Sequence, residues 1–142
     1  MPNGIDLVRA EHERVRELFV RFNATLDSTL VGQTLGALRA REEAEHSALY
    51  ALAHRLVDDP ALMDRLAAAY SAVKRQMDVV SGLNGAPVVN AFQTLQAFVG
   101  DYAKVEETKL LPRLVEHATP EQLEGMATQI LQVKERASAN TR

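Results

Sequence analysis

Apolar residues recur every three or four positions along most of the chain, which is the spacing of an amphipathic helix. The first such stretch runs from about Ile5 to Leu26, and His12 fills a gap in its apolar series. The pattern therefore predicts one long helix, whose buried face consists of Ile5, Val8, Val15, Phe19 and Phe22.

The second stretch runs from about Gln33 to Val57, and we expect it to begin after a break at Gly32. Two acids, Glu42 and Glu45, complete a stripe that is otherwise made of leucines. These leucines are Leu35, Leu38, Leu49, Leu52 and Leu56.

The third stretch begins at Asp59 and Pro60, which are a helix N-cap and a proline at the first helical position. It is expected to stop near Gly82, and Tyr70 lies on its apolar stripe. The other members of this stripe are Leu62, Leu66, Val73, Met77 and Val80.

A turn at Asn84 and Gly85 separates this helix from a fourth, which is expected to start near Pro87. The stripe of the fourth helix consists of Val88, Phe92, Leu95, Val99, Tyr102, Glu106 and Leu110. Thr119 and Gln122 then form a capping box with proline at position 120, so a fifth helix is expected. Its apolar face consists of Leu123, Met126, Ile130 and Val133, and residues 138–142 are expected to fray.

No stretch alternates between apolar and polar residues with period two, so no sheet is expected. Four long helices with short connections predict an all-α fold, an up-down-up-down four-helix bundle. We expect the short fifth, C-terminal helix to pack across this bundle. The 142 residues suit a single domain, 1–142, with its own core.

Composition narrows the classes of function. The chain has no cysteine, which excludes disulfides, thiolate metal sites and cysteine nucleophiles. A net charge of -3 with mixed signs argues against binding to nucleic acid. No apolar run approaches the roughly 20 residues of a membrane span, and the N-terminus lacks the layout of a signal peptide. We therefore expect a cytoplasmic protein, as a monomer or a homo-oligomer.

Several polar residues stand on apolar stripes: His12, Glu45, Tyr102, Glu106 and, on the third helix, Tyr70. A buried carboxylate costs several kcal/mol unless a cation or hydrogen bonds compensate it. Helix bundles build metal sites from inward-facing side chains at this spacing. Carboxylate and imidazole ligands suit iron, manganese or zinc, and a phenolate favours ferric iron. The pattern indicates either a metal site or an unusual polar network.

The sequence also resembles a known family, the hemerythrin-like or HHE cation-binding domain, over nearly its whole length. The stretch IDLVRAEHERVRELFVRF is similar to the family's first helix, and REEAEHSALY to part of its second. YSAVKRQM resembles a stretch of the third helix, and VEETKLLPRLVEHATPEQLEGM the end of the fourth and the start of the fifth.

The resemblance implies particular metal ligands. His12 falls on the family's metal-ligand histidine of helix one, Glu45 and Glu106 on its two bridging carboxylates, and Pro112 on its usual proline. The implied cofactor is non-heme iron, as one or two ions, with dioxygen, peroxide or nitric oxide as ligand.

Three positions depart from the family pattern. Arg41, Tyr70 and Tyr102 stand where the family has histidines. Tyrosine is a competent ferric ligand, and His46 could replace a lost nitrogen if the second helix rotates slightly. We therefore expect redox chemistry or sensing, by an enzyme or a sensor, rather than reversible oxygen storage.

Two other interpretations stay open. Arg41 could pair with Glu45, Glu106 or both, and so leave a metal-free bundle that serves as a regulatory or ligand-binding module. Alternatively, the core could hold a small organic molecule, with Tyr102 and His12 as acid and base. Three further residues are expected to be solvated: Glu107, His54 and His117.

Overall fold

The computed structural model describes the backbone of residues 3–140 and the side chains of residues 3–136. Within this range the chain is helical and contains no strand, which confirms the all-α class. The helices form five long segments that are separated by short connections.

The first segment is helix α1 (Gly4–Thr25), and its boundaries follow from local hydrogen bonds. The Oδ1 atom of Asn3 accepts a hydrogen bond of 3.0 Å from the backbone N–H of Asp6 and so caps the helix. The helix ends at Leu26, whose φ of 53° lies in the left-handed region. Every member of the predicted apolar face is buried, and so is His12.

The predicted break at Gly32 is wrong, because α2 (Thr29–Ala44) begins before it. Oδ1 of Asp27 accepts hydrogen bonds from the backbone N–H and the hydroxyl of Thr29, at 3.0 and 2.8 Å. These two bonds form a turn immediately before the helix. Gly32 then lies in the first turns of α2, where a glycine costs only about 0.5–1 kcal/mol relative to alanine.

Two long segments each contain a π turn. Helix α2 continues without interruption through η1 (Glu45–Tyr50) into α3 (Ala51–Leu56). Helix α5 (Pro87–Val105) continues through η2 (Glu106–Leu110) into α6 (Leu111–His117). Thus each of the two core carboxylates, Glu45 and Glu106, is the first residue of a π turn. Such turns are rare within helices and are frequent at functional sites.

The remaining segments are α4 (Pro60–Ser81) and α7 (Pro120–Asn140). Helix α4 has the predicted cap, since Oδ1 of Asp59 accepts a hydrogen bond of 3.0 Å from the N–H of Leu62. The capping box of α7 is also present, with reciprocal bonds of 2.9 and 3.1 Å between Thr119 and Gln122. The expectation of a short last helix is wrong, because α7 has 21 residues against 22 in α1.

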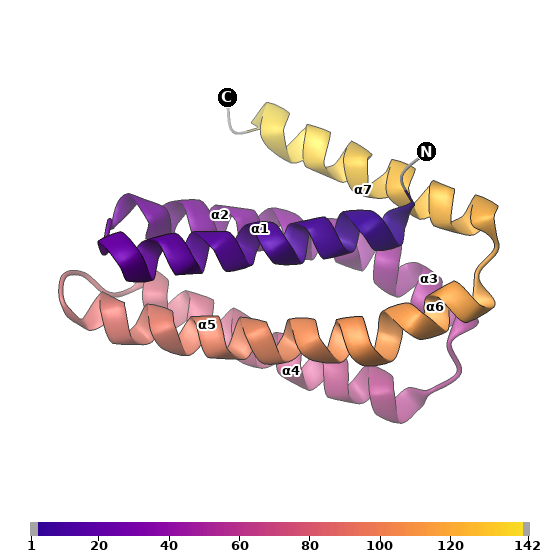
Figure 1. Cartoon of the computed structure of the whole chain (residues 1–142), viewed down its shortest axis with the longest axis horizontal. Coiled ribbons are helices and arrows are strands. Elements are labelled where there is room, and N and C mark those ends of the chain that lie inside the picture. The colour runs from indigo at the N-terminus through magenta and orange to yellow at the C-terminus, as the bar shows by residue number, and fades with distance from the viewer. Residues whose placement is uncertain (1–2, 141–142) are drawn as a thin grey trace.

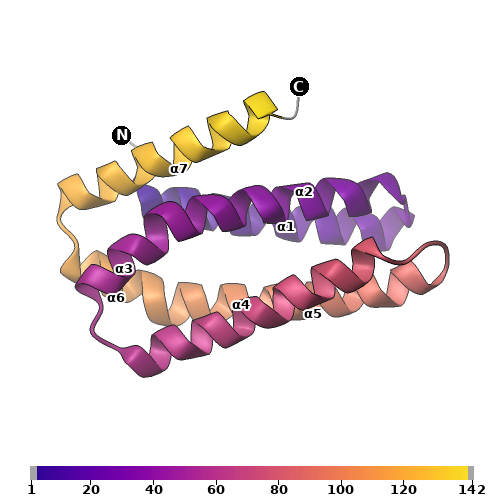
Figure 2. The ribbon, with the colours of Figure 1, turned by 180° about the vertical axis from the view of Figure 1, so that it is seen from behind.

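Figures 1 and 2 show how the helices lie. Helix α4 packs along α5, and α1 packs on both α2 and α5. Helix α7 covers the α1 and α2 pair from outside, on the side away from α4 and α5, and also contacts η1. The apolar stripes meet in one core, in which Phe19 and Phe22 pack against Phe92 at ring-centroid distances of 4.7 and 4.6 Å. None of the described helices is long and apolar enough to cross a membrane.

Candidate metal centre

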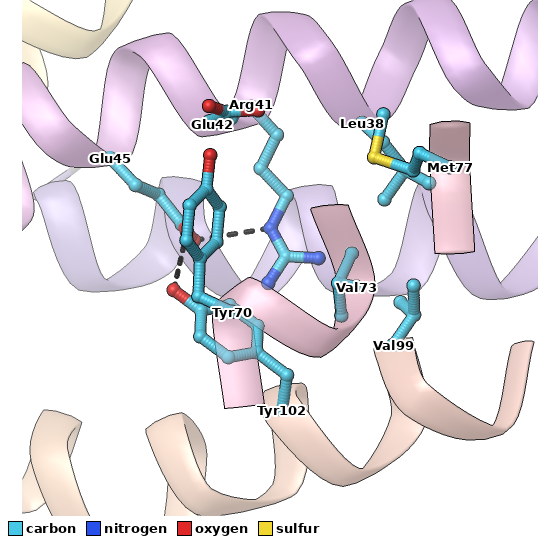
Figure 3. A pocket seen from close by; sticks show the side chains of 9 residues that line it. All are labelled: Leu38, Arg41, Glu42, Glu45, Tyr70, Val73, Met77, Val99 and Tyr102. Atoms are coloured by element: carbon cyan, nitrogen blue, oxygen red, sulfur yellow. Dashed lines mark hydrogen bonds and ion pairs between the residues drawn. The ribbon is translucent and has the colours of Figure 1, made fainter. Parts of the chain in front are cut away.

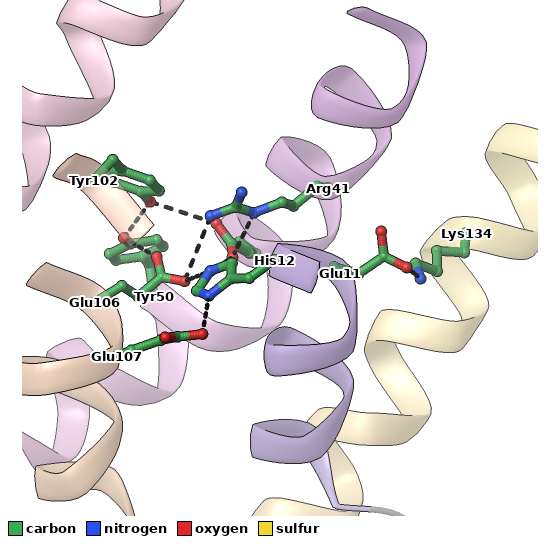
Figure 4. A network of polar contacts seen from close by, with 9 residues as sticks. Glu11, His12, Arg41, Tyr50, Tyr102, Glu106, Glu107 and Lys134 are labelled. Atoms are coloured by element: carbon green, nitrogen blue, oxygen red, sulfur yellow. Dashed lines mark hydrogen bonds and ion pairs between the residues drawn. The ribbon is translucent and has the colours of Figure 1, made fainter. Parts of the chain in front are cut away.

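Three predicted ligands come together inside the helices. His12 projects from α1, Glu45 from the start of η1 and Glu106 from the start of η2. The Nε2 atom of His12 lies 2.9 Å from Oε1 of Glu106 and 3.8 Å from Oε1 of Glu45. One donor atom of each residue lies within 4.8 Å of the others, and all three residues are buried. Figure 4 shows His12 and Glu106 at the centre of this polar cluster.

Glu107 holds the other side of the His12 ring, which corrects the expectation that Glu107 is only solvated. Its Oε1 atom lies 2.6 Å from Nδ1 of His12, and its side chain is 41% exposed. A histidine that binds a metal usually donates its second ring N–H to a carboxylate in this way. The other two residues that we expected in solvent, His54 and His117, are exposed.

Arg41 reaches both core carboxylates, as the alternative interpretation required. Its Nε atom donates a hydrogen bond of 3.1 Å to Oε1 of Glu45, and its Nη2 atom lies 3.8 Å from Oε1 of Glu106. The guanidinium also lies 5.5 Å from the centre of the Tyr102 ring. Nη2 is buried and has no hydrogen-bond partner among the described residues. The positive charge of Arg41 therefore compensates the carboxylates of the cluster, but not all of its N–H donors form hydrogen bonds.

Two tyrosines hold the opposite oxygens of the carboxylates. Tyr50 donates a hydrogen bond of 2.8 Å to Oε2 of Glu106, and the hydroxyl of Tyr102 lies 3.4 Å from Oε2 of Glu45. The two hydroxyls are also hydrogen-bonded to each other. The Oε2 atoms thus face the tyrosines, while the Oε1 atoms face His12 and Arg41.

The two carboxyl groups differ in their electrostatics. Burial raises the pKa of Glu45 well above its usual range, against the opposing charge of Arg41. Burial alone would also raise the pKa of Glu106, but the hydrogen bond from His12 and the charge of Arg41 lower it to about 2. As the pH falls, therefore, Glu45 takes up a proton before Glu106 does.

The neighbouring groups keep their ordinary charge states. Burial, together with the charges of Glu45 and Glu106, raises the pKa of both Tyr50 and Tyr102, so their hydroxyls stay protonated. Burial would lower the pKa of Arg41, but the same two carboxylates raise it, so Arg41 stays a cation.

Tyr70 and His46, which were also predicted as ligands, are not brought into the cluster. His46 is exposed, because a residue adjacent to the buried Glu45 points to a different side of the helix. Its ring packs edge-on against Tyr70, with centroids 4.8 Å apart. Tyr70 lies beside Tyr102, 6.0 Å between centroids, and lines a small cavity of about 20 Å³ with Arg41 (Figure 3). The hydroxyl of Tyr70 is buried without a hydrogen-bond partner among the described residues.

Sequence reasoning missed two members of the network, Tyr50 and Glu107. Tyr50 lies five residues after Glu45, off the helical stripe that an α-helical period defines, and the π turn η1 brings it inward. Glu107 is adjacent to the buried Glu106, so its position pointed to the surface. The sequence offered one weak signal for Tyr50, since the chain has only three tyrosines and the other two were already candidates.

The donor set suits a metal ion. Two ligands that each lie about 2.1 Å from one ion are at most about 4.2 Å apart. The distances from His12 to the two carboxylates, 2.9 and 3.8 Å, fall within this limit. The donor atoms of Glu45 and Glu106 lie at most 4.8 Å apart, and a small movement towards each other would let both bind the same ion. The buried residues His12, Glu45 and Glu106 could therefore hold a metal ion.

Comparison with known proteins adds no family assignment: no family model matches the chain, and no curated protein or solved structure matches it significantly.

Proposed function

We propose that the chain is a hemerythrin-like four-helix bundle, with up-down-up-down topology, that binds one non-heme iron ion in its core. The ligands would be His12, Glu45 and Glu106. The helical fold and the buried histidine–carboxylate cluster support this proposal.

The observation that carries the proposal is the setting of His12. Carboxylate oxygens lie 2.6 Å from its Nδ1 atom and 2.9 Å from its Nε2 atom. Hydrogen bonds to both require an imidazolium, because a neutral imidazole has one N–H and donates to only one of them. A metal ion at Nε2 would satisfy the other nitrogen and both core carboxylates. Glu107 would then fix the ring orientation, as carboxylates commonly do beside metal-bound histidines.

Arg41 and Tyr70 favour one ion rather than two. Both stand at positions where the resemblance places histidines, and neither offers a nitrogen ligand. The guanidinium of Arg41 already lies next to Glu45 and Glu106, so it takes the place of a second cation.

Iron would supply a change of oxidation state and would bind a small molecule such as dioxygen, peroxide or nitric oxide. The protein would orient the carboxylates through the hydroxyls of Tyr50 and Tyr102. Glu106 itself is fully buried. In the metal-free protein, Tyr50 and Tyr102 act as positioning groups through these hydrogen bonds.

Metal analysis of the whole protein tests the proposal directly. After expression in iron-rich medium, we expect about one iron per chain and a higher melting temperature than after treatment with a chelator. His12→Ala and Glu106→Ala should lose the iron, whereas His54→Ala, a change of an exposed histidine, should keep it. Iron well below one per chain, with no gain after anaerobic reconstitution, would refute the proposal.

A second candidate is a metal-free regulatory module, favoured by the contacts of Arg41. The guanidinium lies on the same Oε1 atoms that an ion would use, 3.1 Å from Glu45 and 3.8 Å from Glu106. This candidate predicts that iron, manganese and zinc leave the melting temperature unchanged. It also predicts that Arg41→His creates metal binding that the parent protein lacks.

A further inference from the structure

A cleft of about 490 Å³ opens between α1 and α5 and reaches the polar cluster, because His12 and Arg41 both contribute to its lining. This volume falls within the range of about 300–1,000 Å³ that is typical of small-molecule sites. The cleft is therefore large enough for an organic ligand, rather than for a diatomic molecule alone.

Positive charge predominates in the cleft. Its lining includes three cations, Arg16, Arg41 and Lys104, against two acids, Glu13 and Glu107. Both acids already have partners, since Glu13 lies 2.7 Å from Arg16 and Glu107 lies 2.6 Å from His12. No carboxylate pairs with Lys104 among the described residues, and Arg41, although it lies beside Glu45 and Glu106, keeps Nη2 without a hydrogen-bond partner, so these two cations can receive a monoanion.

Arg41 has unused donors for such an anion. A guanidinium carries five N–H donors, whereas Arg41 makes one hydrogen bond within the described residues, from Nε to Glu45. Its side chain is only 4% exposed, and a buried cation with free donors is a costly arrangement that an anionic ligand would relieve.

The remaining lining is partly apolar and includes a glycine that keeps the space open. Phe19, Val99 and Ala103 form an apolar wall along the cleft. Gly100 lies in the interior of α5, and a Cβ atom placed there meets no atom within 4 Å. Because a glycine inside a helix sacrifices stability relative to alanine, its presence here fits a need for open volume.

We propose that this cleft binds a small organic monocarboxylate, with its carboxylate at Arg41 and Lys104 and its apolar part along the wall. Phosphates fit less well, because the surplus charge is small and the acids Glu13 and Glu107 also face the cleft. The inference does not rest on iron, since Lys104 and the unpartnered Nη2 donor of Arg41 belong to the protein whether or not an ion is bound.

The test is a titration of the full-length, chelator-treated protein with benzoate, followed by calorimetry and by amide chemical shifts. Benzamide, which is uncharged and of similar shape, serves as the matched ligand. We expect benzoate to bind at least about tenfold more tightly than benzamide, because charged hydrogen bonds form only with the carboxylate. The shifted amides should lie along α1 and α5.

Gly100→Leu should weaken benzoate binding at least about tenfold by filling the cleft, and Lys104→Gln should weaken it several-fold. Gly36→Leu is the control, because Gly36 is an exposed glycine of α2 with equally open surroundings. The proposal fails if benzoate does not bind, if benzamide or inorganic phosphate binds as tightly, or if Gly100→Leu still binds benzoate like the parent. Iron content is measured separately, so a protein without iron that binds benzoate refutes only the metal proposal.

Discussion

His12 and Glu107 form a hydrogen bond of 2.6 Å between Nδ1 and Oε1 that joins α1 to η2. The bond orients the imidazole, so that Nε2 faces Glu45 and Glu106. Glu107 itself is 41% exposed, and it therefore connects the buried cluster to the surface of the protein.

Glu107→Gln should weaken metal binding by about 10- to 100-fold, as is usual when the carboxylate partner of a histidine ligand is lost. The ligands themselves remain, so binding should be weakened rather than abolished. Competition with a chelating indicator measures the affinity. Glu116→Gln, which changes an exposed glutamate of α6, should have no effect. Equal affinities for the two variants would show that Glu107 does not support a ligand.

Arg41→Met should destabilise the metal-free protein by about 3–5 kcal/mol, because it leaves the buried carboxylates without their cation. Added metal should restore much of this loss, since an ion would then compensate Glu45 and Glu106. Urea unfolding with and without a chelator measures both effects. Arg39→Met, at an exposed position of the same helix, should stay within about 0.5 kcal/mol of the parent. A loss that metal does not reverse would favour the metal-free module.

Metal affinity should rise with pH. Burial raises the pKa of Glu45, so this carboxyl keeps a proton to higher pH than an exposed glutamate, and the ion must displace that proton. Lower pH retains the proton and weakens binding, whereas Glu106, with a pKa of about 2, is already ionised. Calorimetry in buffers of different ionisation enthalpy should show proton release on binding, and tighter binding towards about pH 8 than at about pH 6. Affinity that is independent of pH would contradict the assignment of Glu45 as a ligand.

Gly4→Ala should destabilise the contact between α1 and α7 by about 1–3 kcal/mol. A Cβ atom at Gly4 would overlap Cε of Met126 and lie 2.9 Å from its Cβ, and the second of these atoms has little freedom to move. Gly125→Ala is the control, because open space surrounds this helical glycine. It should be neutral or stabilise the protein by up to about 1 kcal/mol. A double-mutant cycle with Met126→Ala should recover part of the Gly4→Ala loss.

The centre of the cluster was predictable from the sequence because ionisable residues interrupt regular apolar stripes. His12, Glu45 and Glu106 each occupy a position that the helical period marks as buried, and all three are buried. Arg41 was predictable for a related reason, since it lies one turn before Glu45 and reaches it. These residues come together because the helices pack against one another through their apolar faces.

The other features of the site and of the fold do not follow from a regular helical period of apolar residues. Tyr50 enters the cluster through a π turn, and Glu107 reaches His12 from outside the stripe. Helix α2 begins next to the turn that Asp27 forms with Thr29, and Gly32 does not interrupt it. A π turn and the hydrogen bonds of single side chains account for these positions, so the hydrophobic pattern could not reveal them.

The two π turns have a consequence for recognising relatives of this chain. Each π turn contains one residue more than an α-helical turn. The residues before Glu45 and those after Tyr50 therefore do not follow one continuous 3.6-residue period. Deleting one residue between them would rotate α2 against α3 by about 100° and carry Arg41 away from its present side. A protein with the same residue types but without the two additional residues would therefore build a different interior. Homologues of this cluster should be sought by the length of the two helices as well as by the identity of their side chains.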